Sequence, residues 1–372
     1  MTIAAPESGF HSVGQDVARN IAQRAASAGR LQRTILVHGP AGAGKGAFVD
    51  DLLALLFCQA PMASSRPCNA CRGCRDARAR THPDLLIGSP AGWRDSRATG
   101  ESIVAAARRW LLATATSPVA GEVRVVLIEA ADQANEGIQN ALLKALEEPA
   151  PRQMFILVAQ EVANLLPTIR SRATPLRVGP VPIAQLRELL MDRERLPADQ
   201  AEALARISDG LSGRAIGYAR NPSLLEWRRR TQAELLHLLG RGRADRFASA
   251  RELLDAAAAA GAPPSEPVER VGDEEPVRLA GAAQRAAAML IVEAWRGLAR
   301  DLLMVRSGRL ELAGAIPAAE LTEAATRVDN EALVAFINLL ERIAEGLRAN
   351  AAARLALERA MLAWPSTAPM TR

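Results

Sequence analysis

Residues 34–56 contain a glycine-rich turn with a single lysine. In TILVHGPAGAGKGAFVDDLLALL, a short apolar run precedes the turn and an amphipathic segment follows it. Gly39, Gly42 and Gly44 allow turns that direct backbone N–H groups inward, and a helix N-terminus adds partial positive charge. Lys45 supplies a point charge for the outer phosphates. The stretch therefore predicts a phosphate-binding loop between a buried strand and a helix.

One part of the phosphate-loop pattern is missing. The full pattern, GxxxxGK(S/T), ends in a hydroxyl that ligates magnesium, and Gly46 stands in that place. The alternative is a glycine-rich turn with an incidental lysine, and the composition weighs against it. The chain has 44 arginines but only two lysines, Lys45 and Lys144. A lysine retained in such a chain indicates a site that needs a compact ammonium.

All four cysteines lie in one segment directly after the expected phosphate-loop helix. Their spacing is C-x9-C-x2-C-x2-C, and they are Cys58, Cys68, Cys71 and Cys74. Four thiolates suit tetrahedral zinc, whereas cysteines three residues apart make poor disulfide partners, and a cytoplasmic chain keeps its thiols reduced. The spacing predicts a structural zinc knuckle at residues 58–74, with free cysteines as the alternative.

A second candidate acid ends an apolar strand. The run RVVLIE, residues 124–129, places Glu129 where a nucleotide-hydrolysing domain has its magnesium-orienting acid. That acid is ordinarily an Asp followed by a Glu that polarises the attacking water. Here the second position is Ala130, which cannot act as a base.

The composition fits an ordinary globular protein of two or three domains. Of 372 residues, 49 % are apolar and 23 % charged, and the net charge is +5. No apolar run reaches the roughly 20 residues of a membrane span, and the first residues lack a signal pattern, so we expect a cytoplasmic protein without a membrane partner. The arginines are spread along the chain, so the charge alone does not predict DNA binding.

Strands and helices alternate in the first half of the chain. The first 30 residues are expected to be helical because Val17, Ile21 and Ala25 recur at four-residue spacing. Strands are expected at residues 34–37, 84–88, 124–129, 154–159 and 174–178. This alternation predicts a parallel sheet with helices on both faces and the ligand beyond the carboxyl ends of the strands.

Three domains are expected from the change in pattern along the chain. Residues 1–178 read as the α/β domain, residues 179–221 as a small helical lid, and residues 222–372 as an all-helical domain. Within the last, helices are expected at about 224–260, 277–304, 317–327 and 330–362. The proline-rich, acidic stretch 261–276 interrupts them and is expected to be a mobile loop.

Several motifs together carry a family resemblance. In order they are HGPAGAGKG, the four-cysteine knuckle, THPD, VVLIEAADQANEGIQNALLKALEEP and LLPTIRSR. They resemble the bacterial clamp-loader AAA+ subunits of the DNA polymerase III holoenzyme, over about the first 215 residues. The resemblance implies an AAA+ core, a lid and a helical collar through which gamma/tau, delta and related subunits form a ring of five. That ring opens the sliding clamp and places it on primed DNA.

Three departures from the family's motor subunits affect hydrolysis. Those subunits keep the loop hydroxyl, an Asp-Glu pair, and a Thr or Asn that senses the γ-phosphate. Here the corresponding places are Gly46, Glu129 with Ala130, and Ala159 or Gln160. Each loss costs orders of magnitude in rate, so we expect no intrinsic ATPase even if ATP or ADP binds. The pattern resembles the delta-prime subunits, whose site is degenerate.

The resemblance also implies a role for Arg172. Ser171-Arg172 matches the family's Ser-Arg-Cys motif, with Ala173 in place of the cysteine. In the family this arginine reaches across a subunit interface to a neighbour's ATP, as a trans arginine finger. The alternative is an arginine that merely pairs with a nearby carboxylate. Arg214 lies one residue away from the spacing of the lid's phosphate-sensing arginine and is not assigned to it.

Two other functions remain open. One is a working ATPase of the gamma/tau type, in which Glu129 and water hold the magnesium. The other is a zinc-bearing nucleic-acid-binding module, against which the aromatic content of only 3 % counts.

Overall fold

The computed structural model describes residues 9–260, 275–309 and 318–365, and its chain forms two compact units, residues 1–216 and 217–372. Most of the loop expected at 261–276 lies outside the described residues. Among the described helices, none has a stretch apolar and long enough to span a membrane.

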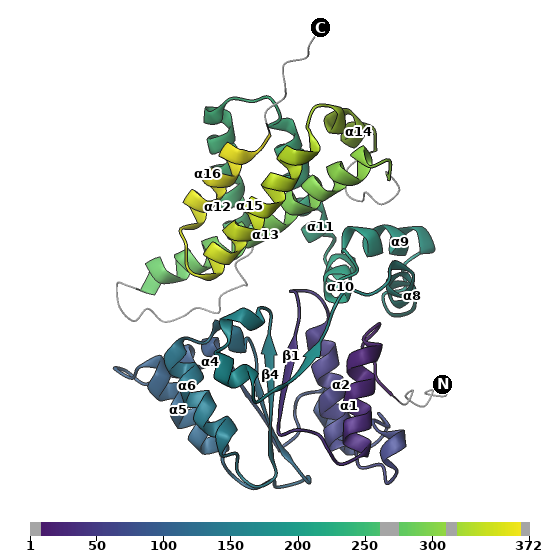
Figure 1. The fold of residues 1–372 in the computed structure, drawn as a ribbon, viewed down its shortest axis with the longest axis vertical. Coiled ribbons are helices and arrows are strands. Elements are labelled where there is room, and N and C mark those ends of the chain that lie inside the picture. The colour runs from purple at the N-terminus through teal and green to yellow at the C-terminus, as the bar shows by residue number, and fades with distance from the viewer. Residues whose placement is uncertain (1–8, 261–274, 310–317, 366–372) are drawn as a thin grey trace. The chain divides into compact units, whose positions relative to one another are not determined.

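The first unit is built on a five-stranded parallel sheet with the strand order β2-β3-β4-β1-β5 (Figure 1). Its strands are β1 (Thr34–His38), β2 (Leu85–Gly88), β3 (Arg124–Ile128), β4 (Gln153–Ala159) and β5 (Thr174–Arg177). In register, Val37 of β1 lies opposite Val158 of β4 and Leu176 of β5. The predicted parallel sheet is confirmed.

Seven α-helices accompany the sheet, and three more follow it. The seven are α1 (Asp16–Ser27), α2 (Lys45–Phe57), α3 (Arg72–Arg78), α4 (Pro90–Asp95), α5 (Ile103–Thr114), α6 (Glu136–Glu147) and α7 (Pro167–Arg170). The three are α8 (Ile183–Arg193), α9 (Ala198–Ile207) and α10 (Ser212–Arg220). Short 3-10 turns occur at Ala63–Ser65 (η1), Ala131–Gln133 (η2) and Val162–Asn164 (η3). The separation of 179–221 as a lid stays a prediction.

Helices cover both faces of the sheet, as the alternation predicted. Successive side chains of a strand point to opposite faces. Ile35 therefore packs in a core with Leu52 of α2, while Leu36 packs in a second core with Leu142 of α6. Figure 1 shows α1 and α2 on one side of β1 and β4, and α5 and α6 on the other. Ligands bind at the carboxyl ends of the strands in such sheets. In this unit loops follow those ends.

Helix α1 buries a different face from the one its apolar residues suggest. Val17 is 76 % exposed and Ile21 45 % exposed, whereas Ala18 and Ala22 are buried. Helix α1 lies against α2, and the alanines allow the two backbones to approach closely. The apolar spacing therefore predicted the helix correctly but did not identify its buried face.

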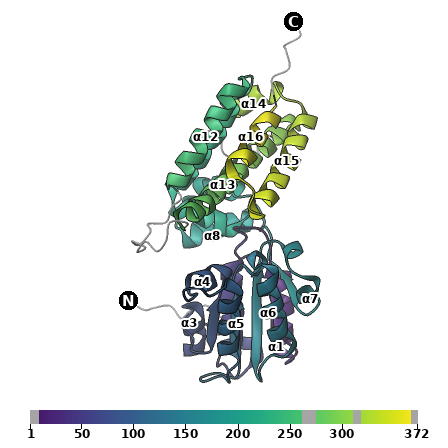
Figure 2. The same cartoon turned by 90° about the vertical axis from the view of Figure 1, so that its left-hand side faces the viewer.

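The described part of the second unit is all helical. Its helices are α11 (Pro222–His237), α12 (Arg243–Ala260), α13 (Glu275–Arg306), α14 (Ala318–Thr326), α15 (Asn330–Arg348) and α16 (Ala353–Ala363). Figure 2 shows α12, α13, α15 and α16 side by side. Helix α13 contacts the other three, and α16 also contacts α12 and α15. Their core contains fully buried Trp295, and the rings of Phe336 and Trp364 pack 4.8 Å apart between centroids.

Two of the helices expected in this unit are interrupted. The helix predicted over 224–260 breaks between α11 and α12, where Gly240 has φ +80°. The helix predicted over 330–362 breaks between α15 and α16, where Asn350 has φ +69°. Both residue types adopt left-handed backbone at low cost and so end helices. After the second break, α16 packs against α15.

Candidate phosphate-binding site and metal cluster

The loop between β1 and α2 has the backbone that the glycine pattern predicted. Its glycines with positive φ are Gly39, Gly42 and Gly44. Gly44 is the residue that precedes α2, with φ +93°, and a Cβ there would lie 2.5 Å from Ser212 Oγ. Glycine is therefore needed at this position for both conformation and space. The loop directs the N-terminus of α2 toward the carboxyl end of β1.

Lys45 is the first residue of α2 and folds back over the loop. Its Nζ donates hydrogen bonds to the carbonyl oxygens of Gly39 at 2.6 Å and Pro40 at 2.9 Å. Burial lowers the pKa of Lys45, and the carboxylate of Asp132 acts in the opposite direction. The ammonium therefore lies against the glycine-rich loop, in the arrangement that suits a phosphate-facing charge.

The start of α10 is hydrogen-bonded to the same loop. The backbone N–H groups of Gly213 and Arg214 both donate to the carbonyl oxygen of Gly42, at 2.8 and 3.2 Å. The Arg214 side chain is only 9 % exposed and its Nη1 lies 3.1 Å from Asp209 Oδ2. The segment after the sheet is thus fixed to the phosphate loop, and Arg214 has a carboxylate partner of its own.

Glu129 makes an ion pair with Arg80, a residue that the sequence analysis did not single out. Arg80 Nη1 donates to Glu129 Oε1 at 2.6 Å, and Arg80 Nε donates to Asp50 Oδ1 at 2.9 Å. Burial acts to lower the pKa of Arg80, but these two carboxylates outweigh it and raise the pKa. Gly46 and Ala130 lack the hydroxyl and the base. No sequence motif indicates Arg80, because its partners lie 30 and 49 positions away.

Asp132, in η2, is a second residue that the sequence analysis missed. Its Oδ2 accepts hydrogen bonds from the backbone N–H groups of Gln160 and Glu161, which follow β4, at 3.1 and 2.9 Å. Its Oδ1 is buried and has no hydrogen-bond partner among the described residues. A carboxylate three positions after Glu129 was the available signal. Asp132 therefore fixes the tip of β4.

The four cysteines come together at the other end of α2. Their sulfur atoms all lie within 4.8 Å of one another, and the residues are Cys58, Cys68, Cys71 and Cys74. Four thiolates around zinc at about 2.3 Å would lie about 3.8 Å apart, close to the spread of this cluster. The cluster can therefore hold one metal ion of that size.

Backbone N–H groups converge on these sulfur atoms. Cys58 Sγ accepts from Cys68 N at 3.4 Å, and Cys71 Sγ accepts from Cys74 N at 3.4 Å. Burial acts to raise the pKa of Cys68, but backbone donors outweigh it and lower the pKa to about 6. A Cβ at Gly73 would lie 2.0 Å from Phe57 O, so glycine allows α3 to pack on the end of α2. The thiolate form is therefore favoured at Cys68, whereas burial raises the pKa of Cys58 and Cys74.

His82 and Asp84 anchor the chain between the cysteines and β2. The His82 ring stacks on Phe57, with ring centroids 3.8 Å apart, so this histidine lies outside the metal cluster. Asp84 is fully buried and its carboxylate lies 3.1 Å from Arg124 Nη2. It also accepts backbone N–H groups from residues 119, 120 and 121 at 2.6–2.8 Å. Burial acts to raise the pKa of Asp84, but these donors lower it.

Arg172 lies on the surface just after α7. Its side chain is 41 % exposed, and its Nη2 lies 2.9 Å from Glu147 Oε1, whose own side chain is 42 % exposed. Its Nη1 also donates to the carbonyl oxygen of Thr168 at 3.1 Å. The guanidinium is therefore held by two local contacts at a position open to solvent.

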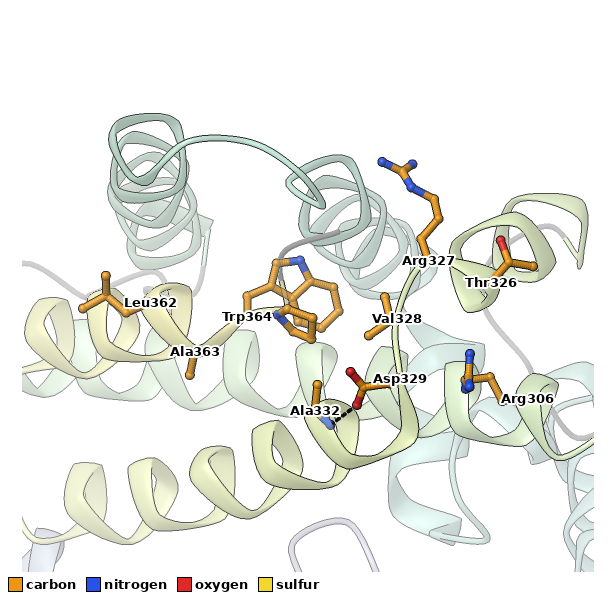
Figure 3. Close-up of a pocket in the computed structure, with 10 residues that line it drawn as sticks. Arg306, Thr326, Arg327, Val328, Asp329, Ala332, Leu362, Ala363 and Trp364 are labelled. Atoms are coloured by element: carbon orange, nitrogen blue, oxygen red, sulfur yellow. Dashed lines mark hydrogen bonds between the residues drawn. The ribbon is translucent and has the colours of Figure 1, made fainter. Parts of the chain in front are cut away.

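The second unit has a hollow of about 510 Å³ between the turn after α14 and the end of α16 (Figure 3). Arg306, Arg327 and Trp364 contribute to its lining. Arg306 Nη1 donates to the carbonyl oxygen of Ala325 at 2.6 Å, so this arginine is part of the packing. None of the site residues predicted from the sequence lines this hollow.

The sheet order, the glycine loop after β1 and the helices on both faces define a phosphate-loop protein of the AAA+ class. Residues 14–182 match the family model described as DNA polymerase III, delta subunit. The match covers less than half of the chain and shows what this part of it is similar to.

The chain is also similar to individual DNA polymerase III subunits. The chain is 35 % identical to DNA polymerase III subunit delta' of Pseudomonas aeruginosa over 188 residues, which are 49 % of this chain and 55 % of the relative. It is 31 % identical to the Escherichia coli protein of that name over 189 residues, 51 % of this chain and 55 % of the relative. It is 26 % identical to DNA polymerase III subunit tau of Salmonella typhimurium over 210 residues, 55 % of this chain and 31 % of the relative. The chain thus spans about half the length of its delta' relatives.

Proposed function

We propose that this protein is a non-hydrolysing clamp-loader subunit of the delta-prime type within a DNA polymerase III holoenzyme. In this role it scaffolds a ring with gamma/tau and delta subunits, and the ring uses ATP to load a sliding clamp on primed DNA. The observation that carries the proposal is the site around Lys45. It keeps a glycine-rich phosphate loop but has Gly46 and Ala130 where hydrolysis needs a hydroxyl and a base.

The proposal assigns Arg172 to a neighbouring subunit's ATP. A guanidinium near the γ-phosphate stabilises the charge that develops as the phosphoryl group leaves. The pair with Glu147 does not prevent this, because an ion pair between two exposed side chains is worth about 0–1 kcal/mol. A neighbour's triphosphate offers more negative charge than the Glu147 carboxylate.

The cysteine cluster is assigned a structural zinc ion. Four sulfur atoms within 4.8 Å of one another would supply all four ligands of a structural zinc ion, which leaves no position for a substrate. The ion would connect the end of α2 to α3 and so shape the segment that leads to Arg80 and β2.

Turnover by the assembled complex tests the role of Arg172. In a loader reconstituted with Arg172→Ala, we expect ATP hydrolysis at the neighbouring site to slow by about a hundredfold or more, with ring assembly unchanged. Arg172→Lys should also fail, because an ammonium lacks the planar fork. The matched control is Arg170→Ala, which removes an equally exposed arginine from the same turn. Unchanged turnover with Arg172→Ala would remove this role.

A working ATPase of the gamma/tau type is the second candidate, favoured by the likeness to subunit tau. It requires Glu129 to hold magnesium, whereas Glu129 is paired with Arg80. Steady ATP turnover by the purified chain alone would support it over the first proposal.

A further inference from the structure

A guanidinium lies between the two residues that flank the magnesium position in sites of this class. In this class of site, the ion lies between the residue after the loop lysine and the acid at the end of the third strand. Those positions are Gly46 and Glu129. Arg80 Nη1 lies 2.6 Å from Glu129 Oε1, and Arg80 Nη2 lies 3.8 Å from the place of a Cβ on Gly46. The donor set therefore does not fit a magnesium ion, because one ligand is missing and the other is already paired with a cation.

Arg80 is held in this position by its backbone and by a second carboxylate. It follows α3 with φ +57°, a left-handed conformation that turns the chain back toward α2. Its Nε donates to Asp50 Oδ1 at 2.9 Å, and Asp50 lies one turn of α2 beyond Gly46. Its side chain is 30 % exposed, so the pair is partly shielded from water. Among the described residues, Nη2 donates no hydrogen bond, and it faces Gly46.

We infer that the Arg80 guanidinium takes the place of magnesium, so that this site binds a nucleoside di- or triphosphate without a divalent cation. The inference rests on the proposed non-hydrolysing role. It adds that the nucleotide binds without a divalent cation.

The argument is electrostatic. An unpaired Glu129 beside the phosphate loop would repel a polyphosphate, and in ordinary sites the metal cancels that repulsion. Here Arg80 offsets part of the negative charge of Glu129 and Asp50, while Lys45, the loop N–H groups and the N-terminus of α2 attract the phosphates. A guanidinium cannot lower the pKa of an attacking water as a metal does, so the site binds without cleaving.

Binding of ADP to the purified full chain tests the inference. We expect the same affinity, within about twofold, in excess Mg²⁺ and in Mg²⁺-free buffer without a chelator, measured by calorimetry with metal-replete cysteine clusters. Absence of ADP binding in both conditions, or an affinity that rises about tenfold with Mg²⁺, would overturn it.

The variant Arg80→Gly sharpens the test, because glycine suits the positive φ. In Mg²⁺-free buffer its affinity for ADP should fall about tenfold, since Glu129 and Asp50 then face the site without a cation. In Mg²⁺ its affinity should return toward that of the parent chain, because the two carboxylates can now hold the ion. If the affinity of Arg80→Gly for ADP were the same with and without Mg²⁺, the inference would be contradicted.

The matched control is Arg152→Gly. Arg152 is an exposed arginine that also has positive φ, +60°, and lies in the turn before β4. It should leave the affinity unchanged in both conditions. Circular dichroism and thermal unfolding of both variants separate loss of folding from loss of binding. Failure of these binding experiments would leave the proposed role of Arg172 standing, and unchanged turnover with Arg172→Ala would leave this inference standing.

Discussion

Helix α2 has a candidate binding site at each end, and the two sites are assembled from different sources. At its N-terminus, the site consists of a glycine loop, Lys45, and an ion pair that joins Glu129 to Arg80. At its C-terminus, four cysteines from residues 58–74 bring their sulfur atoms within 4.8 Å of one another. The first site lacks groups that its chemistry ordinarily requires, whereas the second has a full set of ligands.

Under the proposed function, the first site does not hydrolyse nucleotide but keeps its structural frame. Residues of α2 between the two ends, such as Leu52 and Leu53, are buried in the core on one face of the sheet. That core does not depend on the loop hydroxyl or on the catalytic base. A chain that no longer cleaves nucleotide can therefore keep the helix, the loop and the cysteine cluster in place.

The largest expected effect is the loss of the metal ion from the complete site. We expect about one zinc ion per chain in the purified protein and none in Cys74→Ser, because Cys74 is fully buried and supplies one of four ligands. Elemental analysis measures the content. Asp76→Asn, which changes a carboxylate of α3 two positions after Cys74, should keep the ion. A full metal content in Cys74→Ser would contradict the four-sulfur site.

Chelation should loosen the cysteine segment and leave the sheet intact, because Cys58 and Cys74 are only two of the many buried residues in one core of the first unit, and the second core contains no cysteine. Hydrogen exchange should increase within residues 58–74 only. Global unfolding on chelation would show instead that the first unit depends on the metal.

A smaller effect is expected at Asp84, which anchors the chain that returns from the cysteine cluster to β2. Asp84→Asn should lower the free energy of unfolding by about 2–4 kcal/mol, because it leaves buried Arg124 without its carboxylate. Exposed Asp95→Asn is the control and should change little.

The pH dependence has a definite sign. Because folding lowers the pKa of Asp84, its contribution is present above the unfolded value of about 3.9 and is lost as the pH falls through the lower folded value. Denaturant unfolding at pH 7 and in acid should show that Asp84→Asn destabilises the protein less in acid. An equal loss at both values would contradict this sign.

The smallest effect is expected at the incomplete site. Lys45→Ala should weaken ADP binding by about tenfold, since one charge-assisted contact is worth about 1.5–3 kcal/mol and part of the loop remains. Lys144→Ala, which removes the only other lysine, should have no effect because that residue is exposed on α6. An equal loss of ADP affinity in Lys45→Ala and Lys144→Ala would show that Lys45 has no specific role in binding.

The two ends of α2 also differ in how far the sequence predicted them. The cysteine site is contained in 17 consecutive residues, so its ligands could be named from spacing alone. The phosphate loop, the missing hydroxyl at Gly46 and the missing base at Ala130 could also be read from local motifs.

The roles of Arg80 and Asp132 could not be read from local motifs. They depend on the fold, which brings β3, β4 and the turn after α3 together.

Periodicity predicted the elements that are buried on both faces well. It predicted less well which face of a partly exposed helix is buried. The buried strands, such as β3, read as continuous apolar runs, and the parallel sheet followed from their alternation with helices. Helix α1 was found, but Val17 and Ile21 turned out exposed because close contact with α2 selects alanine. The helix breaks at Gly240 and Asn350 depend on single left-handed residues, which a helical pattern does not locate.

ATP hydrolysis by the purified chain alone is the most direct test of the central claim, which is that the loop keeps a place for phosphate but lacks the means to cleave it. The account predicts no turnover above background at saturating ATP and Mg²⁺, with or without DNA. Steady turnover that disappears in Lys45→Ala would contradict it.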